Sequence, residues 1–484
     1  VSAPEWYNSI INRGTLEISG GTIKSSKKGI YNNSILKMTG GTVEVQEPNN
    51  AALECGGGTA TIEGGTIKYN NAGNTSYNTA AIRITTNTAT LTLGKEDGNV
   101  SITNPEIIGS RYGINNEGNG TFNFYDGIIK GKTAINGNLS AKEKGYEVIT
   151  TEENEIETAI LGNLPVAKIG EKEYYTFQEA FDACPSDGTE TTVEVLRNCT
   201  TDMANIIEEN KNIVLDIQSY KIVSGIENLF TNNGKFKIVD SIGNGRIISA
   251  KGTILRNEET GSFAINNITM QMTGSSAIDE TIENKGMLEI TGGVIISDGL
   301  KNKCINNIEQ GTVKITGGTV SAYTYAIYNT SSNKVEIEGG TVQATYNYEG
   351  YSAIYNNTEN GVVEIKGGLV TNQGKAIENK KGIIKVTGGE IRSTQGDTRY
   401  SECGIYNNGK LIIEDGKVAA LYRGSGIQNE GGTIEITGGT VSAPEWYNSI
   451  INRGTLEISG GTIKSNQKGI YNNSTLKMTG GTVE

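Results

Sequence analysis

The sequence predicts an all-β fold, a parallel β-solenoid with three short strands in each coil. Glycine is frequent and proline is rare, 65 and 6 residues of 484, which favours many short strands joined by tight turns. A Gly-Gly-Thr-Ile or Gly-Gly-Thr-Val motif recurs, for example at 20–23, 40–43, 317–320 and 438–441. The motif returns after about 20 to 28 residues, the length of one solenoid coil. Apolar and polar residues alternate before each motif, which is the period of a half-buried strand.

One complete coil can be followed through residues 353–370. It begins with Ala-Ile-Tyr-Asn, a first strand whose isoleucine points inward. A turn of variable length leads to the alternating run Val-Val-Glu-Ile at 362–365, the Gly-Gly pair makes a corner, and a short third strand completes the coil. A single coil cannot bury its apolar side chains, so coils must stack about 4.8 Å apart and place isoleucine on isoleucine in continuous interior ladders.

An asparagine recurs two residues after the inward apolar residue of the first strand. Stacked turns leave backbone groups that strands do not satisfy, and an amide side chain can both donate and accept hydrogen bonds. We therefore expect a structural ladder rather than a ligand site at Asn32, Asn284, Asn329, Asn356, Asn379, Asn407, Asn429 and Asn472, and at the equivalent Asn12, Asn116, Asn232, Asn257, Asn307 and Asn452.

Residues 141–212 break the repeat and are expected to form a connecting module. Thr176 and Glu179 have the spacing of a capping box, and the apolar residues that follow share one helical face, so a short helix is predicted near 177–184 and ended by Pro185. The predicted organisation is a solenoid block at 1–140, the connecting module, and a second solenoid block at 213–484.

The five cysteines contain no Cys-x-x-Cys pair, which argues against a zinc site or a thioredoxin-like motif. Cys184 and Cys199 are close in the sequence and flank one predicted strand, so they could form a disulfide. The other three cysteines are expected to be small residues inside coils.

The chain also resembles a known family. The stretches AKIGEKEYYTFQEAF at 167–181, VEVL at 193–196 and NIVLDIQSYKI at 212–222 are similar to the first module of pectin-lyase-like right-handed parallel β-helices in large surface proteins of Gram-positive anaerobic bacteria. The EITGGTV coils are similar to the repeats of the same proteins. The resemblance covers essentially the whole chain and implies an extracellular, cell-surface protein used as a stalk, fibre or adhesin, in which the short helix covers the open end of a solenoid.

A second, much longer repeat is present. Residues 1–44 and 441–484 are identical at 41 of 44 positions, the exceptions being 26 against 466, 27 against 467 and 35 against 475. This offset of 440 residues predicts a tandem array of large units. Neither end of the sequence reads as a cap, and an uncapped solenoid exposes a rung of unpaired backbone. The expected partners are therefore adjoining repeat units, or copies of the same protein, placed end to end.

Composition narrows the remaining classes of function. The formal net charge of −12 disfavours nucleic-acid binding, and the absence of histidine removes the commonest general base and metal ligand. No apolar run reaches the roughly 20 residues of a membrane-spanning helix. We expect no cofactor, no metal, no catalytic residue and no membrane insertion, and the favoured function is a structural segment of an extracellular bacterial filament or surface stalk.

Two alternatives remain open. A glycan-binding adhesin could use outward tyrosines of the first strands, among them Tyr328, Tyr355 and Tyr406, which could stack on sugar rings or else cover neighbouring turns. A polysaccharide lyase would need clustered carboxylates. The outward acids at one repeated position, Glu17, Glu289, Glu336, Glu364, Glu435 and Glu457, are interpreted as a solvated face, and enzymatic activity is not expected.

Overall fold

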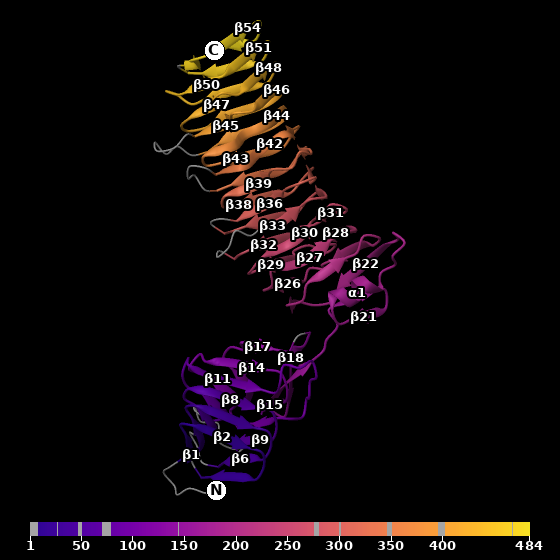
Figure 1. Cartoon of the computed structure of the whole chain (residues 1–484), viewed down its shortest axis with the longest axis vertical. Coiled ribbons are helices and arrows are strands. Elements are labelled where there is room, and N and C mark those ends of the chain that lie inside the picture. The colour runs from indigo at the N-terminus through magenta and orange to yellow at the C-terminus, as the bar shows by residue number, and fades with distance from the viewer. Residues whose placement is uncertain are drawn as a thin grey trace. The chain divides into compact units, whose positions relative to one another are not determined.

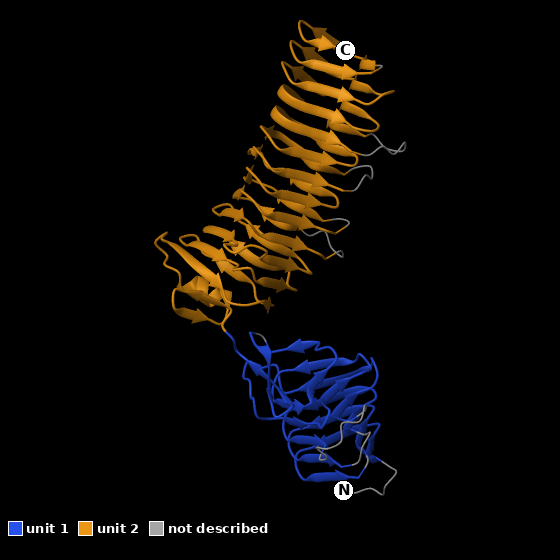
Figure 2. Cartoon of the chain, turned by 180° about the vertical axis from the view of Figure 1, so that it is seen from behind, with its two compact units in different colours: residues 1–164 blue, residues 165–484 orange. Residues whose placement is uncertain are grey.

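The computed structural model describes residues 8–26, 28–46, 51–69, 79–143, 145–274, 280–299, 302–345, 351–394, 402–466 and 468–484. The chain divides into two compact units, unit 1 at Val1–Leu164 and unit 2 at Pro165–Glu484 (Figure 2). Each unit is a parallel β-solenoid with three strands in each coil, as the sequence predicts (Figure 1). The boundary between the units lies inside the expected connecting module at 141–212.

Unit 1 has three faces, numbered in the order in which the chain crosses them. The first face contains β1 (Asn8–Asn12), β4 (Lys28–Asn32), β7 (Ala51–Cys55), β10 (Ala80–Ile84), β13 (Tyr112–Asn116) and β16 (Thr133–Asn136). The second face contains β2 (Thr15–Ile18), β5 (Ile35–Met38), β8 (Gly58–Ile62), β11 (Ala89–Leu93), β14 (Thr121–Phe124) and β17 (Ala141–Lys142). The third face contains β3 (Thr22–Ser25), β6 (Thr42–Val45), β9 (Thr66–Tyr69), β12 (Glu106–Ile108) and β15 (Ile128–Gly131).

An antiparallel hairpin ends the parallel stack of unit 1. It consists of β18 (Glu147–Glu153) and β19 (Ile156–Gly162), and β19 pairs antiparallel with β15. Ala159 and Leu161 of the hairpin are buried in the core, and Leu139 and Tyr146 of the preceding segment pack against it. The hairpin and this segment therefore cover the end of the solenoid core.

Unit 2 repeats the three-faced arrangement over more coils. Its first face contains β24 (Asn205–Ile207), β27 (Asn228–Asn232), β30 (Thr253–Asn257), β33 (Glu280–Asn284), β36 (Lys303–Asn307), β39 (Tyr325–Asn329), β45 (Cys403–Asn407), β47 (Ser425–Asn429), β50 (Asn448–Asn452) and β53 (Lys468–Asn472). The second face contains β22 (Glu190–Val195), β25 (Asn212–Asp216), β28 (Lys235–Val239), β31 (Ser262–Asn266), β34 (Met287–Ile290), β37 (Thr312–Ile315), β40 (Val335–Ile337), β48 (Thr433–Ile436), β51 (Thr455–Ile458) and β54 (Thr475–Met478).

The third face of unit 2 follows the Gly-Gly corners. It contains β23 (Cys199–Thr201), β26 (Lys221–Ser224), β29 (Arg246–Ser249), β32 (Thr269–Met272), β35 (Val294–Ser297), β38 (Thr319–Ala322), β41 (Thr341–Ala344), β43 (Leu369–Asn372), β49 (Thr440–Ala443), β52 (Thr462–Ser465) and β55 (Thr482–Val483). Three long strands run through corners and serve more than one face: β42 (Ser352–Ile365), β44 (Lys375–Ser393) and β46 (Lys410–Ala420). Parallel pairing begins at β22, one coil before the predicted start at 213.

The start of unit 2 is covered by a small cap. The strands β20 (Ala167–Ile169) and β21 (Lys172–Tyr174) pair antiparallel and precede α1 (Phe177–Ala183). The predicted capping box is confirmed, because Thr176 accepts a hydrogen bond from the Glu179 amide and the Glu179 carboxylate accepts one from the Thr176 amide. Phe181 is fully buried and its ring centroid lies 5.8 Å from that of Phe236 in β28. The helix thus covers the open core of the first coils.

The core consists of stacked apolar side chains in register. On the first face Ile305, Ile327 and Ile354 occupy equivalent positions of successive coils, and all three are fully buried. The Gly-Gly corners stack in the same way. A Cβ at Gly318, where φ is 78°, would lie 2.7 Å from the carbonyl oxygen of Gly293 in the preceding corner. Glycine is therefore required there both by the backbone angle and by the close approach of the corners.

Candidate functional site: side-chain ladders along the coils

The most regular polar feature is a ladder of asparagines inside the first face of unit 2. Each Nδ2 donates to the Oδ1 of the next asparagine along the solenoid, over distances of 2.7 to 3.0 Å. The ladder joins Asn232, Asn257, Asn284, Asn307, Asn329, Asn356, Asn379, Asn407, Asn429, Asn452 and Asn472, so it contains all the predicted asparagines of this unit.

The asparagines also hold the turns that follow them. Asn284 Nδ2 donates to the carbonyl oxygen of Gly286 at 3.2 Å and to that of Thr312, in the next coil, at 3.0 Å. Asn329 and Asn284 are fully buried, and only Asn472, in the last coil, is exposed. The amide groups are thus used within the fold, and this ladder has a structural rather than a ligand-binding geometry.

In unit 1 the ladder is short. Asn12 donates to Asn32 at 2.7 Å, but the next two positions are Cys55 and Ile84, which carry no amide. Asn32 instead donates to the carbonyl oxygen of Thr59 at 3.2 Å. At the remaining predicted position, Asn116 Nδ2 donates to the carbonyl oxygen of Gly120 at 2.8 Å and to that of Asn138, in the next coil, at 3.3 Å, and its Oδ1 accepts from the Gly120 amide at 2.9 Å.

Two of the three predicted tyrosines belong to a tyrosine cluster on the outer side of the first face. Tyr328 and Tyr355 are register neighbours whose rings stack with centroids 4.8 Å apart and an angle of 14°. Lys303, from the preceding coil, lies 4.2 Å from the Tyr328 centroid. Tyr325 contacts both rings and Tyr351 edge-on, at 5.2 to 5.6 Å. The faces of Tyr328 are therefore covered by Lys303 and by Tyr355, which leaves ring edges and hydroxyls for any ligand.

Tyr406 is separated from this cluster by a buried carboxylate. Glu378 occupies the intervening register position, is 2% exposed, and forms ion pairs with Lys375 at 3.2 Å and with Lys380 at 3.0 Å. Lys375 also lies 4.3 Å from the ring centroid of Tyr406. Burial raises the pKa of Tyr355 and of Tyr406 above the ordinary range, so both phenols stay neutral at physiological pH.

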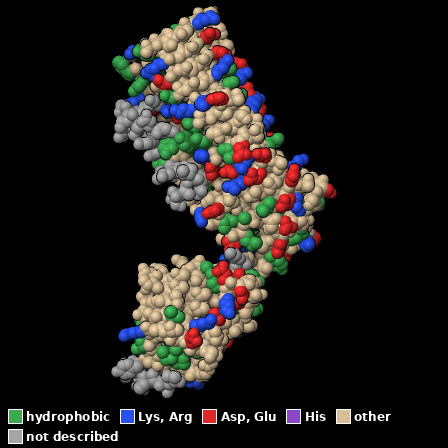
Figure 3. Space-filling model, in the orientation of Figure 1, with side chains coloured by type: hydrophobic (Ala, Val, Ile, Leu, Met, Phe, Trp, Pro, Cys, Tyr) green, Lys and Arg blue, Asp and Glu red, His purple; other side chains and the backbone are tan. Residues whose placement is uncertain are grey.

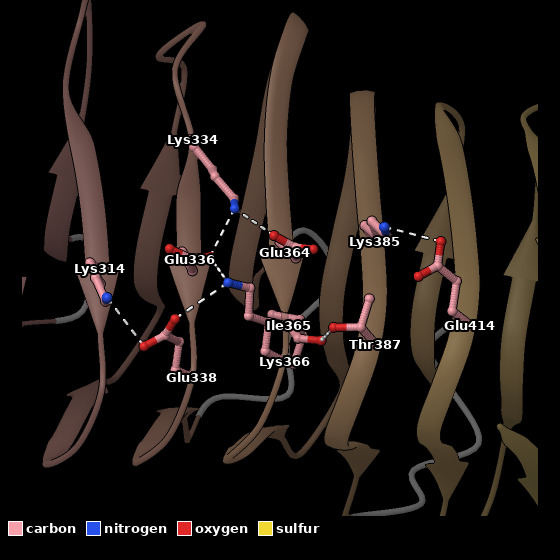
Figure 4. Close-up of polar contacts among 10 residues, drawn as sticks. All are labelled: Lys314, Lys334, Glu336, Glu338, Glu364, Ile365, Lys366, Lys385, Thr387 and Glu414. Atoms are coloured by element: carbon pink, nitrogen blue, oxygen red, sulfur yellow. Dashed lines mark hydrogen bonds and ion pairs between the residues drawn. The ribbon is translucent and has the colours of Figure 1, made fainter. Parts of the chain in front are cut away.

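The outer side of the second face carries a network of ion pairs between coils (Figure 4). Lys334 lies 2.8 Å from Glu336 and 2.5 Å from Glu364 of the next coil. Lys366 contacts Glu336 from the other side and lies 3.3 Å from Glu338, so the two lysines bridge three carboxylates. On the face shown in Figure 3, acidic and basic side chains are interspersed along unit 2 in the same manner.

The outward acids considered for catalysis are used in these pairs or face water. Glu336 and Glu364 are register neighbours, as are Glu435 and Glu457, which line a hollow of about 160 Å³. Glu289 faces Lys314 in the next coil. Hydrogen bonds from Lys334 and Lys366 lower the pKa of Glu336 to about 2. A carboxylate with so low a pKa is a poor proton donor at neutral pH, whereas a general acid needs a raised pKa.

Glu17 occupies the equivalent position in unit 1 and faces Lys37 of the next coil.

All five cysteines are buried thiols. The disulfide considered between Cys184 and Cys199 is not formed; Cys184 instead donates from its thiol to the carbonyl oxygen of Ala180, one helical turn earlier. Burial raises the pKa of Cys55 and of Cys403 to about 12, which keeps both protonated. These side chains are packed as small apolar residues.

Within the described ranges, no group of three or more histidine, cysteine, aspartate or glutamate side chains could hold a metal ion. The described part of the chain also lacks a helix long and apolar enough to cross a membrane. Comparison with protein families, curated proteins and solved structures found no match to this chain. The resemblance to pectin-lyase-like surface proteins therefore stays an expectation, while the parallel β-solenoid fold is established by the strand pairing.

Sequence reasoning missed two parts of this arrangement. Tyr325 joins the tyrosine cluster although it does not occupy the repeated outward position, and Glu378 is buried in a row of outward residues. A signal was available for Glu378, because lysines both precede and follow it within three residues.

Proposed function

We propose that this protein is a structural segment of an extracellular bacterial filament or surface stalk built from tandem units of about 440 residues. The observation that carries the proposal is the combination of uninterrupted strand pairing through unit 2 with the near-identity of residues 1–44 and 441–484. The extracellular location and the bacterial source rest on the resemblance of the connecting module and the coils to surface proteins.

The side-chain ladders support a mechanical role. Ten successive hydrogen bonds between asparagine side chains run along unit 2 inside the core, and ion pairs link coils on the outside. Coils joined in this way resist local opening, because separating two neighbours breaks backbone, amide and ionic contacts together. A spacer that must keep its length outside the cell needs this property.

Electron microscopy and localisation test the proposal. Material purified from cells that carry the gene is imaged, and antibodies raised against unit 2 are used to find the protein. Rods repeated at the spacing of a 440-residue unit, labelled outside the cell, are expected. Discrete single globules, or labelling confined to the cell interior, would contradict the proposal.

A glycan-binding adhesin is the second candidate, with the tyrosine cluster as its site. Its support is weaker because the ring faces that would stack on sugars are covered by Lys303 and by neighbouring tyrosines. A glycan array with wild-type protein and the Tyr355→Ala variant would show sugar-specific binding that the variant loses if the adhesin hypothesis holds. A polysaccharide lyase has the least support, because the outward carboxylates Glu336 and Glu364 are already engaged in ion pairs with Lys334 and Lys366.

A further inference from the structure

The near-exact repeat places the same residues in two different environments. Strands β1–β3 of unit 1 and β50–β52 of unit 2 have identical sequences. In unit 2 these strands pair with β47, β48 and β49 of the coil before them. In unit 1 the described strands β1–β3 are the outermost strands of their three sheets. We call these three strands the N-terminal rim of unit 1.

Identical side chains are less buried in the N-terminal rim than in unit 2. Ser449, Ile450 and Leu456 are fully buried in unit 2, whereas the identical Ser9, Ile10 and Leu16 are only half-buried. The apolar side chain of Ile11 is 55% exposed. The coil formed by residues 425–443 accounts for this difference, because it is the coil that β50–β52 rest on.

At the C-terminal end of unit 2, the exposed copy of the repeat lies in unit 2 and the covered copy lies in unit 1. Strands β53–β55, the C-terminal rim of unit 2, copy β4–β6 of unit 1, which are covered by β7, β8 and β9. Leu476 and Met478 are 39% and 44% exposed, whereas the equivalent Leu36 and Met38 are 1% and 0% exposed. Position 35 against 475, the described substitution within these strands, is exposed in both copies and leaves the packing surface unchanged.

We propose that the two rims are interaction surfaces for specific coils of neighbouring repeats. The N-terminal rim takes a coil with the sequence of 425–443, and the C-terminal rim takes one with the sequence of 51–69. The inference rests on the tandem arrangement proposed above. Under this proposal, unit 2 of one repeat and unit 1 of the next repeat form one composite solenoid. That solenoid begins at α1, runs to residue 484, and continues with the sequence that follows residue 44.

This composite solenoid is covered at both ends. The helix α1 covers its first coils, and the hairpin β18–β19 covers its last coil. Its second face would contain the strands β22 to β54 and then β8 to β17, about 17 strands spaced ~4.8 Å apart, or a length of roughly 77 Å. Only the short segment 163–166 joins the hairpin of one rod to β20 of the next. The filament is thus a chain of capped rods rather than one endless solenoid.

A permuted chain tests the proposal. In this chain, residues 165–484 are followed directly by residues 45–164. Because Glu484 is the equivalent of Glu44, the junction reproduces the Glu44–Val45 peptide bond. The permuted chain therefore contains one complete 440-residue repeat without duplication. We expect a monomeric protein with one cooperative thermal transition. The matched control joins 165–473 to 45–164, which omits β54 and β55 and sets β7 on the wrong face. The control is expected to aggregate or to melt well below the permuted chain.

Hydrogen exchange supplies a second readout that does not depend on the control. Residues 36–44 and 476–484 give peptides of identical sequence. In the full chain this peptide should show two populations, one slow from unit 1 and one fast from the rim. In the permuted chain only the slow population should remain, exchanging at least ~100-fold more slowly than the rim copy, because covered amides exchange only on opening.

Two outcomes would overturn the inference: a folded permuted chain whose shared peptide still exchanges fast, or a permuted chain and control that behave alike. These results are separable from a failure of the proposed function. An intracellular protein could still form the composite rod, and an extracellular filament could still be built without it.

Discussion

Removing one rung of the asparagine ladder should destabilise the solenoid locally and measurably. In Asn329→Ala, Oδ1 no longer accepts from Asn307 at 2.7 Å and Nδ2 no longer donates to Asn356 at 2.8 Å. Two buried hydrogen bonds at about 1 kcal/mol each, plus the cost of a buried Oδ1 on Asn356 without its donor, give a loss of about 2 to 4 kcal/mol. Asn307 is less affected, because its Nδ2 keeps the Gly311 carbonyl at 2.9 Å.

The assay is hydrogen exchange of β36, β39 and β42, combined with thermal unfolding by circular dichroism. A loss of about 2 to 4 kcal/mol corresponds to roughly 30- to 900-fold faster exchange in these strands. Asn472→Ala is the matched control, because Asn472 is exposed and forms a single ladder bond, with Asn452. Equal effects of Asn329→Ala and Asn472→Ala, or a change below about 0.5 kcal/mol for Asn329→Ala, would refute the reasoning.

Three further predictions concern the cap, the tyrosines and the charges. Phe181→Ala should cost about 3 to 5 kcal/mol at the start of unit 2, because a fully buried ring is lost, and hydrogen exchange of β22–β28 should rise while β47–β51 stay protected. Tyr355→Ala should lower stability by about 1 to 2 kcal/mol through loss of the stack on Tyr328, while Tyr355→Phe should stay within about 0.5 kcal/mol in chemical denaturation. Glu336→Gln should cost about 1 kcal/mol at pH 7, since its partners are partly exposed. The pKa of Glu336 is lowered from 4.5 to about 2, so its contribution is complete above pH 4.5 and should disappear in an acid titration through pH 2.

Much of the fold could be predicted because its determinants are local. The alternation that ends at Ile337 and the Gly-Gly pair at 339–340 specify a strand and a corner without reference to the rest of the chain. The asparagine ladder followed from the same logic, since Asn329 recurs at a fixed place in each coil. The helix α1 was predictable from the capping-box spacing of Thr176 and Glu179, the apolar face that follows and Pro185.

The hairpin and the buried carboxylate could not be predicted in this way. The period-2 pattern of Glu147–Glu153 and Ile156–Gly162 identifies strands but does not say whether they pair parallel or antiparallel, and here they turn back on each other. Burial of Glu378 depends on Lys375 and Lys380 of its own strand β44 and on the tyrosines that occupy its register position in the coils on either side. The domain boundary depends on the same hairpin, because its residues Ala159 and Leu161 belong to the core of unit 1.

The middle coils and the end coil of a solenoid have opposite requirements for pairing, and different residues meet these requirements in this chain. Coils in the middle of a stack need partners on both sides, and the ladder from Asn232 to Asn472 provides them at every coil. The last coil must not pair with further strands, because unpaired backbone groups at a sheet edge can bind strands of other chains. In unit 1 Cys55 and Ile84 replace the asparagines of the ladder, and on the third face the stack ends in the antiparallel strand β19. The ladder from Asn12 to Asn32 ends three coils before the hairpin, and the last coils are held by strand pairing, by apolar packing against the hairpin, and by a separate hydrogen bond from Asn136 Nδ2 to Asn115 Oδ1 at 2.7 Å.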